Sequence, residues 1–150
     1  MADLSRLSLN SATVKAQWSL AEVIEGCARH GIPGIAPWRD KLHEYGLEAA
    51  VKHVRDAGLT LSGLCRGGMF PAADKAGRDA ALADNRLAVD EARALDAACL
   101  VLVVGGMPEG SKDLAGARQQ VHDGIAATLE YARSVDMPLA IEPLHPMYAA

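Results

Sequence analysis

The sequence lacks the features that mark membrane and secreted proteins. No uninterrupted apolar run approaches the roughly 18 residues that a membrane helix needs. The N-terminus has no basic segment followed by the apolar stretch of roughly 7 to 15 residues that a secretory signal shows. The sequence therefore predicts no membrane partner and no secretory leader, and we expect a cytoplasmic protein.

The sequence also has few cysteines and no large excess of charge of one sign. The three cysteines, Cys27, Cys65 and Cys99, lie far apart and form no C-x-x-C pair, which argues against a disulfide framework or a zinc ribbon. Fifteen basic and nineteen acidic residues give a net charge of −4. This balance predicts no polycationic surface, so we expect neither nucleic acid nor anionic lipid as a partner.

What the sequence does contain is helical periodicity over four segments of a 150-residue chain, a length typical of a single domain spanning 1–150. In Ser19–His30 the apolar residues recur at helical spacing. Ser19 and Glu22 predict a capping box at its start, and Gly31 predicts its end. Three further helices are expected over residues 47–58, about 79–95 and about 113–135. In the helix expected over about 79–95, acidic residues such as Glu91 are expected away from the apolar face.

Short apolar runs separate these helices and predict strands. The run Leu100–Val104 is apolar on both faces, which is typical of a strand in a parallel sheet that is covered above and below. The alternation of strands and helices predicts right-handed crossovers and a parallel sheet. The five expected strands are Leu7–Asn10, Gly34–Trp38, Leu59–Cys65, Cys99–Val104 and Leu139–Glu142.

Two α/β architectures accommodate this order of elements. An open doubly wound sheet usually covers its last strand with a terminal helix, and none follows the last expected strand. A (β/α)8 TIM barrel takes about 250 residues, of which this chain has little more than half. We therefore expect an incomplete TIM barrel, its N-terminal part, with about five parallel strands and four helices.

Polar or aromatic residues follow four of the expected strands. In both architectures the active site lies at the carboxyl ends of the strands, which makes Asn10, Trp38 and Arg66 candidate substrate-binding residues. The flat face of Trp38 could form the wall of a sugar pocket or fill the barrel mouth. The guanidinium of Arg66 could bind an anionic or hydroxylated ligand, or only water.

Glu142 is the most informative of these residues. It ends a strand that we expect to be buried, and a buried carboxylate costs several kcal/mol unless it is paired, hydrogen-bonded or bound to a metal. We expect Glu142 to be catalytic or to bind a metal, and the alternative is a structural ion pair with an arginine such as Arg66. His145 could reach the same ligand if the chain turns after Pro143, or could be a solvated loop histidine.

Five phrases, in order along essentially the whole chain, resemble the xylose-isomerase-like sugar phosphate isomerase/epimerase superfamily. This superfamily includes hydroxypyruvate isomerases, ketose 3-epimerases, inosose dehydratases and DNA-repair enzymes of the endonuclease IV type. The most specific phrase is the last, and the five are Leu7-Ser8-Leu9-Asn10, Gly34-Ile35-Ala36-Pro37-Trp38-Arg39, Asp84-Asn85-Arg86, Leu100-Val101-Leu102-Val103-Val104-Gly105-Gly106 and Ala140-Ile141-Glu142-Pro143-Leu144-His145-Pro146.

The resemblance implies a TIM barrel with a divalent metal (Mn, Mg, Co or Zn) at its carboxyl mouth. In the family a glutamate from the fifth strand binds the metal, together with an aspartate, a histidine and a glutamate from strands six to eight. Glu142 matches the first ligand, which in the epimerases is also an acid/base, and His145 takes the position of a residue near the substrate. The remaining ligands are expected beyond residue 150.

The resemblance also implies the activity of the complete enzyme. We expect a metal-dependent isomerase or epimerase (or dehydratase) of a small sugar or sugar phosphate, acting by proton abstraction next to a carbonyl and through an enediolate. The isolated 150 residues are expected to be inactive. The alternatives are an endonuclease IV-like phosphodiesterase on DNA and a non-catalytic half-barrel whose exposed strand edges pair with another chain or a second copy.

Overall fold

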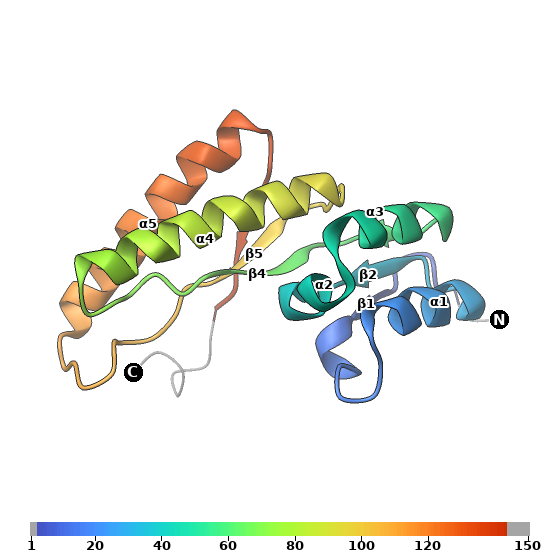
Figure 1. The fold of residues 1–150 in the computed structure, drawn as a ribbon, viewed down its shortest axis with the longest axis horizontal. Coiled ribbons are helices and arrows are strands. Elements are labelled where there is room, and N and C mark those ends of the chain that lie inside the picture. The colour runs from blue at the N-terminus through green and yellow to red at the C-terminus, as the bar shows by residue number, and fades with distance from the viewer. Residues whose placement is uncertain (1–2, 144–150) are drawn as a thin grey trace. The chain divides into compact units, whose positions relative to one another are not determined.

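The computed structural model describes residues 3–143, in which strands and helices alternate along the chain (Figure 1). Two compact units make up the chain: the first contains the residues up to 65 together with 91–99, and the second contains 66–90 and the residues from 100 onward. The strands are β1 (Ser8–Asn10), β2 (Gly34–Ala36), β3 (Thr60–Leu61), β4 (Leu64–Gly68), β5 (Leu100–Val103) and β6 (Leu139–Ile141). The helices are η1 (Ser11–Thr13), α1 (Leu20–His30), α2 (Arg39–Tyr45), α3 (Leu47–Asp56), α4 (Lys75–Ala94) and α5 (Leu114–Ser134).

In the first unit, β1, β2 and β3 form a parallel sheet in that order. The register pairs Asn10 with Ala36, so β1 and β2 end side by side. Helices α1, α2 and α3 contact one another, and α1 also contacts β2. The core of this unit is apolar, and its largest fully buried side chains include Leu20, Ile24, Ile35 and Leu42.

Helix α1 begins and ends where the sequence predicts. The backbone N–H of Ser19 donates to Glu22 Oε2 (2.7 Å), and the N–H of Glu22 donates to Ser19 Oγ (3.4 Å), which completes the capping box. Gly31 follows the helix with a φ of 68°, a left-handed conformation that glycine adopts without steric cost.

In the second unit, β4, β5 and β6 form a sheet in that order, and β5 pairs with β6 in parallel. Helices α4 and α5 lie side by side in this unit (Figure 1), and side chains from both line one pocket. Leu100 and Leu102 of β5 are fully buried, together with Val89 of α4 and Ala132 of α5. The continuous apolar run over β5 therefore forms the middle strand of the sheet, but Val101 and Val103 are only half-buried, so one face of the strand is less covered than the sequence predicts.

The described residues contain six strands and five α-helices, against the expected five and four. The expected third strand is interrupted at residues 62–63, so it becomes β3 and β4, and β4 continues to Gly68. Helix α2 escapes sequence reasoning because it has only seven residues, and the two that it buries are Leu42 and a charged residue, Arg39.

The fold class is α/β with parallel strands, as predicted, and both sheets are open. Of the helices in residues 3–143, none combines the length and the apolarity that crossing a membrane requires. The prediction of a single domain over 1–150 stays a prediction.

Candidate functional site

Asn10 and Trp38 lie at the carboxyl ends of the paired strands β1 and β2, and their side chains are joined by a hydrogen bond. The indole Nε1–H of Trp38 donates to Asn10 Oδ1 (2.9 Å), and the backbone N–H of Trp38 donates to Ser11 Oγ (3.0 Å). Asn10 Oδ1 also accepts the backbone N–H of Ala12 (3.0 Å), which caps η1. Trp38 is therefore held through both its ring nitrogen and its backbone N–H.

A cation completes this cluster. Lys15 Nζ lies 4.8 Å from the centroid of the Trp38 ring, within the range of a cation–π interaction. Trp38 is half-buried and Lys15 is exposed, so the cluster borders solvent. Sequence reasoning missed Ser11 and Lys15. The position of Ser11 directly after a strand end could have indicated it, whereas no spacing rule points to Lys15.

In the second unit, the predicted Arg66 lies in the middle of β4 and is half-buried. Two residues later the strand is fixed by a buried side chain: Asn85 Oδ1 accepts the N–H of Gly68 (2.6 Å), and Asn85 Nδ2 donates to the Gly68 carbonyl (2.8 Å). Gly68 has a φ of 100°, and a Cβ there would collide with the Val103 backbone. Asn85 and Gly68 thus determine the path of the chain beyond Arg66.

Glu142 follows β6, and its backbone N–H donates to the carbonyl of Leu102 (3.0 Å), which extends the pairing with β5 by one residue. Its side chain is exposed, so the expectation of a buried carboxylate is wrong. Within residues 3–143, β6 pairs with β5 alone, and the preceding Ile141 is 57% exposed. The open edge of the sheet therefore leaves this strand end in contact with solvent.

The structure thus brings Asn10 and Trp38 together in the first unit and places Arg66 and Glu142 at strands of one sheet in the second. His145 lies outside the described residues. The roles of all five residues in substrate or metal binding stay predictions.

A buried ionic cluster in the first unit was also missed. Glu91, expected off the apolar face of its helix, is only 4% exposed. Its Oε2 accepts from Arg39 Nε (2.5 Å), and its Oε1 lies 2.7 Å from His43 Nε2. The guanidinium of Arg39, itself 8% exposed, neutralises the carboxylate and so allows its burial.

The metal implied by the resemblance can be tested against the side chains present. Across residues 3–143, no three His, Cys, Asp or Glu side chains gather closely enough to hold a metal ion. Glu142 is the single predicted ligand among them, whereas Mg²⁺ or Mn²⁺ requires about six ligand atoms. The described residues by themselves do not fit a divalent metal site.

Comparison with solved structures identifies relatives of this fold. Protein SMc04130 from Sinorhizobium meliloti 1021 is 56% identical over 99% of this chain, which covers 54% of that protein, with a TM-score of 0.95. D-psicose 3-epimerase in the presence of D-fructose matches 95% of the chain at 19% identity, with 54% of the epimerase covered and a TM-score of 0.78. The IolI protein with a bound zinc atom matches 89% at 18% identity, with 50% covered and a TM-score of 0.76.

The last two likenesses are at low identity and show the fold alone. The chain spans about half the length of each of these structures. No curated protein matches the sequence significantly. The family model of the xylose isomerase-like TIM barrel matches residues 24–150, most of the sequence, and the chain therefore belongs to the xylose isomerase-like TIM barrel family.

Proposed function

We propose that this chain forms part of the substrate-binding face of a sugar isomerase or epimerase that acts on a small free or phosphorylated sugar. The observation that carries the proposal is the Trp38 indole, held by Asn10 at the carboxyl ends of two paired strands. Active sites of TIM-barrel enzymes lie at this end of the strands. The family match supports an enzyme, and the epimerase among the similar folds agrees with the sugar chemistry.

The chemistry of each side chain suggests its part in binding. The flat ring of Trp38 can pack against the C–H face of a sugar, and the bond to Asn10 sets the plane of the ring before substrate arrives. Arg66 carries a planar fork of donors that suits a hydroxyl pair or a phosphate. Lys15 places a positive charge beside the same ring.

Glu142 is the proposed acid/base. Its exposed carboxylate can take the proton from the carbon next to the substrate carbonyl, the step that isomerisation and epimerisation share. A second acid from outside the described residues would return the proton at the other face or at the neighbouring carbon. A divalent metal remains an expectation of the family resemblance, and ligands other than Glu142 would have to come from outside residues 3–143.

The test is solvent exchange at the reacting carbon, measured by NMR in D₂O with the protein that contains this chain and a panel of free and phosphorylated ketoses. We expect deuterium to enter the carbon next to the carbonyl of at least one ketose. Glu142→Gln should slow this exchange by about 10²- to 10⁴-fold, the usual contribution of a general acid or base. Glu130→Gln, an exposed glutamate on α5, removes the same charge elsewhere and should leave the rate unchanged.

A second variant tests the binding role of the indole. Trp38→Phe keeps an aromatic face but removes the donor to Asn10, and it should raise KM about 5- to 10-fold while kcat changes little. Exchange that persists undiminished in Glu142→Gln would refute the role of Glu142. If no ketose exchanges and the protein cleaves abasic-site DNA instead, the sugar proposal is wrong as a whole.

A further inference from the structure

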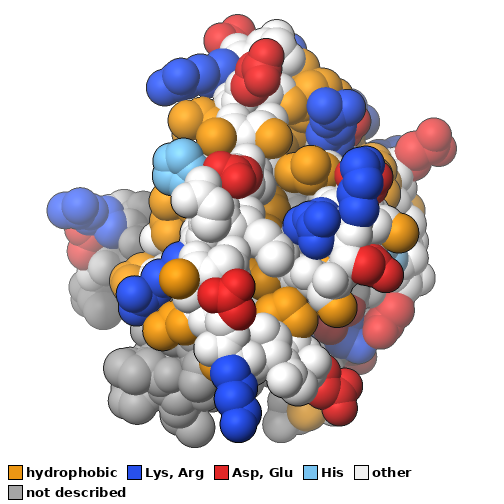
Figure 2. All heavy atoms as spheres, turned by 90° about the vertical axis from the view of Figure 1, so that its left-hand side faces the viewer, with side chains coloured by type: hydrophobic (Ala, Val, Ile, Leu, Met, Phe, Trp, Pro, Cys, Tyr) orange, Lys and Arg blue, Asp and Glu red, His pale blue; other side chains and the backbone are white. Residues whose placement is uncertain are grey.

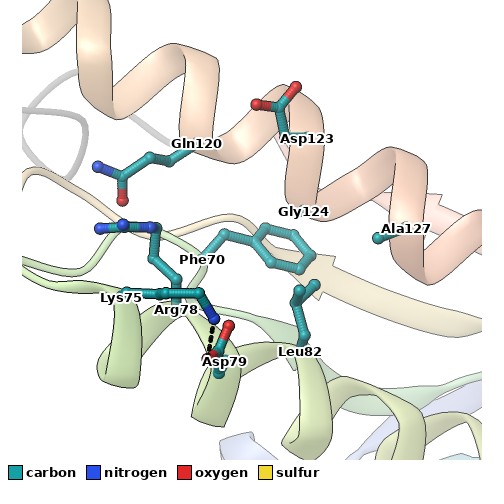
Figure 3. Close-up of a pocket in the computed structure, with 9 residues that line it drawn as sticks. All are labelled: Phe70, Lys75, Arg78, Asp79, Leu82, Gln120, Asp123, Gly124 and Ala127. Carbon is teal, nitrogen blue, oxygen red and sulfur yellow. Dashed lines mark hydrogen bonds and ion pairs between the residues drawn. The ribbon is translucent and has the colours of Figure 1, made fainter.

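A pocket of about 460 Å³ lies between α4 and α5 in the second unit (Figure 3). Helix α4 contributes Arg78 and Leu82, helix α5 contributes Gln120 and Ala127, and Phe70 reaches in from the segment after β4. Its volume lies within the range of roughly 300–1,000 Å³ that small-molecule sites occupy. None of the strand-end residues of the proposed active site lines it, so the pocket needs an explanation of its own.

One end of the pocket is apolar. The ring of Phe70, which is 3% exposed, lies between the two helices with Leu82 beneath it and Ala127 beyond it (Figure 3). The ring also lies against the backbone of α5 at Gly124, where any Cβ would collide with it. This packing holds the ring in place, so that only its small exposed part lines the pocket beside Leu82.

The other end is polar. Gln120 Oε1 accepts the backbone N–H of Ala72 (2.9 Å), which orients the side-chain amide and leaves its NH₂ group as a donor. Figure 3 shows the guanidinium of Arg78 next to this amide, on the side of the pocket away from Leu82. A guanidinium and an amide NH₂ at one end are donors that suit a carboxylate.

The other charged residues that line the pocket make hydrogen bonds to neighbouring side chains. Lys75 Nζ donates to Asp79 Oδ2 (2.6 Å). Asp123 is directed away from the pocket in Figure 3, and hydrogen bonds from His122 and Gln119 lower the pKa of its carboxyl. Arg78 is therefore the lining cation that no carboxylate of the described residues neutralises.

The face that Figure 2 views carries charges of both signs. Figure 2 shows apolar side chains between acidic and basic ones on the face that it views, without an excess of either sign. Within the pocket, Arg78 is the cation available for an anionic ligand. Arg78 at one end, and Leu82 with the exposed edge of Phe70 at the other, match a ligand with one negative charge and a flat apolar body.

We infer that this pocket binds a small aromatic monocarboxylate, with its ring against Phe70 and Leu82 and its carboxylate on Arg78 and Gln120. The inference does not rest on the proposed sugar chemistry. Its site lies between two helices, whereas the residues of the proposed active site lie on or next to strands.

The test is an NMR titration of the nitrogen-15-labelled protein with 4-methylbenzoate as the probe. We expect saturable shift changes at the amides of Phe70, Gly124 and Ala127. The neutral isostere 4-methylbenzamide and the ring-free acetate should each bind at least about 10-fold more weakly, because each lacks one half of the match.

Matched variants locate the two ends of the site. Arg78→Gln should weaken 4-methylbenzoate binding about 10-fold or more, whereas Arg118→Gln, at an exposed position of α5 outside the lining, should not. Ala127→Leu should fill the apolar end and abolish binding, and Ala126→Leu, at an exposed position next to it, should not. The amide spectrum of each variant reports its fold independently of binding.

Three results would overturn the inference. They are the absence of saturable binding by the folded protein, equal affinity for the acid and its amide, and shift changes confined to residues outside α4, α5 and the segment after β4. A loss of binding in Arg118→Gln as large as in Arg78→Gln would equally contradict it, because the effect would then follow net charge and not the site.

Discussion

The side-chain amide of Asn85 makes hydrogen bonds to both backbone groups of Gly68, the last residue of β4. Asn85 is fully buried on α4, and its Nδ2 also donates to the carbonyl of Ala81 (2.8 Å). The amide therefore continues the pairing of β4 where the strand ends, in place of another strand. This contact ties α4 to the sheet two residues after Arg66.

Replacing this amide should destabilise the protein strongly. Asn85→Ala leaves the N–H and the carbonyl of Gly68 without their partner, and we expect the free energy of unfolding to fall by about 2–3 kcal/mol. Urea denaturation followed by circular dichroism measures the change. Leu87→Ala, at an exposed position two residues along α4, should stay within about 0.5 kcal/mol of the wild type. Equal stability of Asn85→Ala and Leu87→Ala would contradict the importance of the contact.

The pair of Arg39 and Glu91 predicts a non-additive result. Glu91→Leu removes the carboxylate that pairs with the buried guanidinium of Arg39 and should cost about 3–5 kcal/mol. The double variant Arg39→Met/Glu91→Leu removes both charges and should recover part of that loss. Chemical denaturation of the two single variants and the double variant gives the coupling energy, and a coupling near zero would show that the two charges do not stabilise each other.

The contact between Gly124 and Phe70 predicts that adding a single methyl group, in Gly124→Ala, lowers the stability of the protein. Alanine favours a helix over glycine by about 1 kcal/mol, yet the Cβ of Gly124→Ala would overlap the Phe70 ring, so we expect a net loss of about 1–2 kcal/mol. In a Phe70→Leu background the same substitution should become neutral or stabilising. Thermal unfolding of all four proteins tests this, and an equal loss in both backgrounds would place the clash elsewhere.

The capping box of α1 predicts a dependence of stability on pH. Hydrogen bonds from Ser19, first from its backbone N–H and then from its hydroxyl, lower the pKa of the Glu22 carboxyl. The folded state therefore favours the charged form, so this contribution to stability is present above the ordinary glutamate pKa and is lost as the pH falls through the lowered value.

Glu22→Gln should accordingly lower Tm at pH 7, and the difference from the wild type should shrink towards pH 3. Glu25→Gln, on the same helix but outside the box, is the matched control because it removes the same charge. A Tm difference for Glu22→Gln that is the same at both pH values would mean that the capping box is not the source.

The sequence predicts the regular elements well where local signals are strong. The start of α1 follows from Ser19 and Glu22 and its end from Gly31, since capping depends on residues within one turn. The uninterrupted apolar run Leu100–Val104 identifies β5, because the middle strand of a parallel sheet has few polar positions. Helix α2 gave no such signal, since seven residues hardly show a period and its buried residues include Arg39.

The candidate site, too, has features that the sequence predicts and features that it does not. The position of Asn10 and Trp38 after two strands predicts that they share an edge, because parallel strands end on the same side. That the indole donates to Asn10, and that Lys15 lies over its ring, depends on rotamers and on a turn that no spacing rule describes. The exposure of Glu142 was also beyond the sequence, because burial of a strand end depends on which strands pair beside it.

The sequence by itself determined the alternation of strands and helices, the family and the strand ends that carry polar residues, because periodicity, capping and motifs are local properties. Only the tertiary structure decided which distant groups meet: Arg39 with Glu91, Asn85 with Gly68, and Phe70 with Gly124 between α4 and α5. These pairs are many residues apart in the chain, and the free energy of their contacts arises only when packing removes both partners from water.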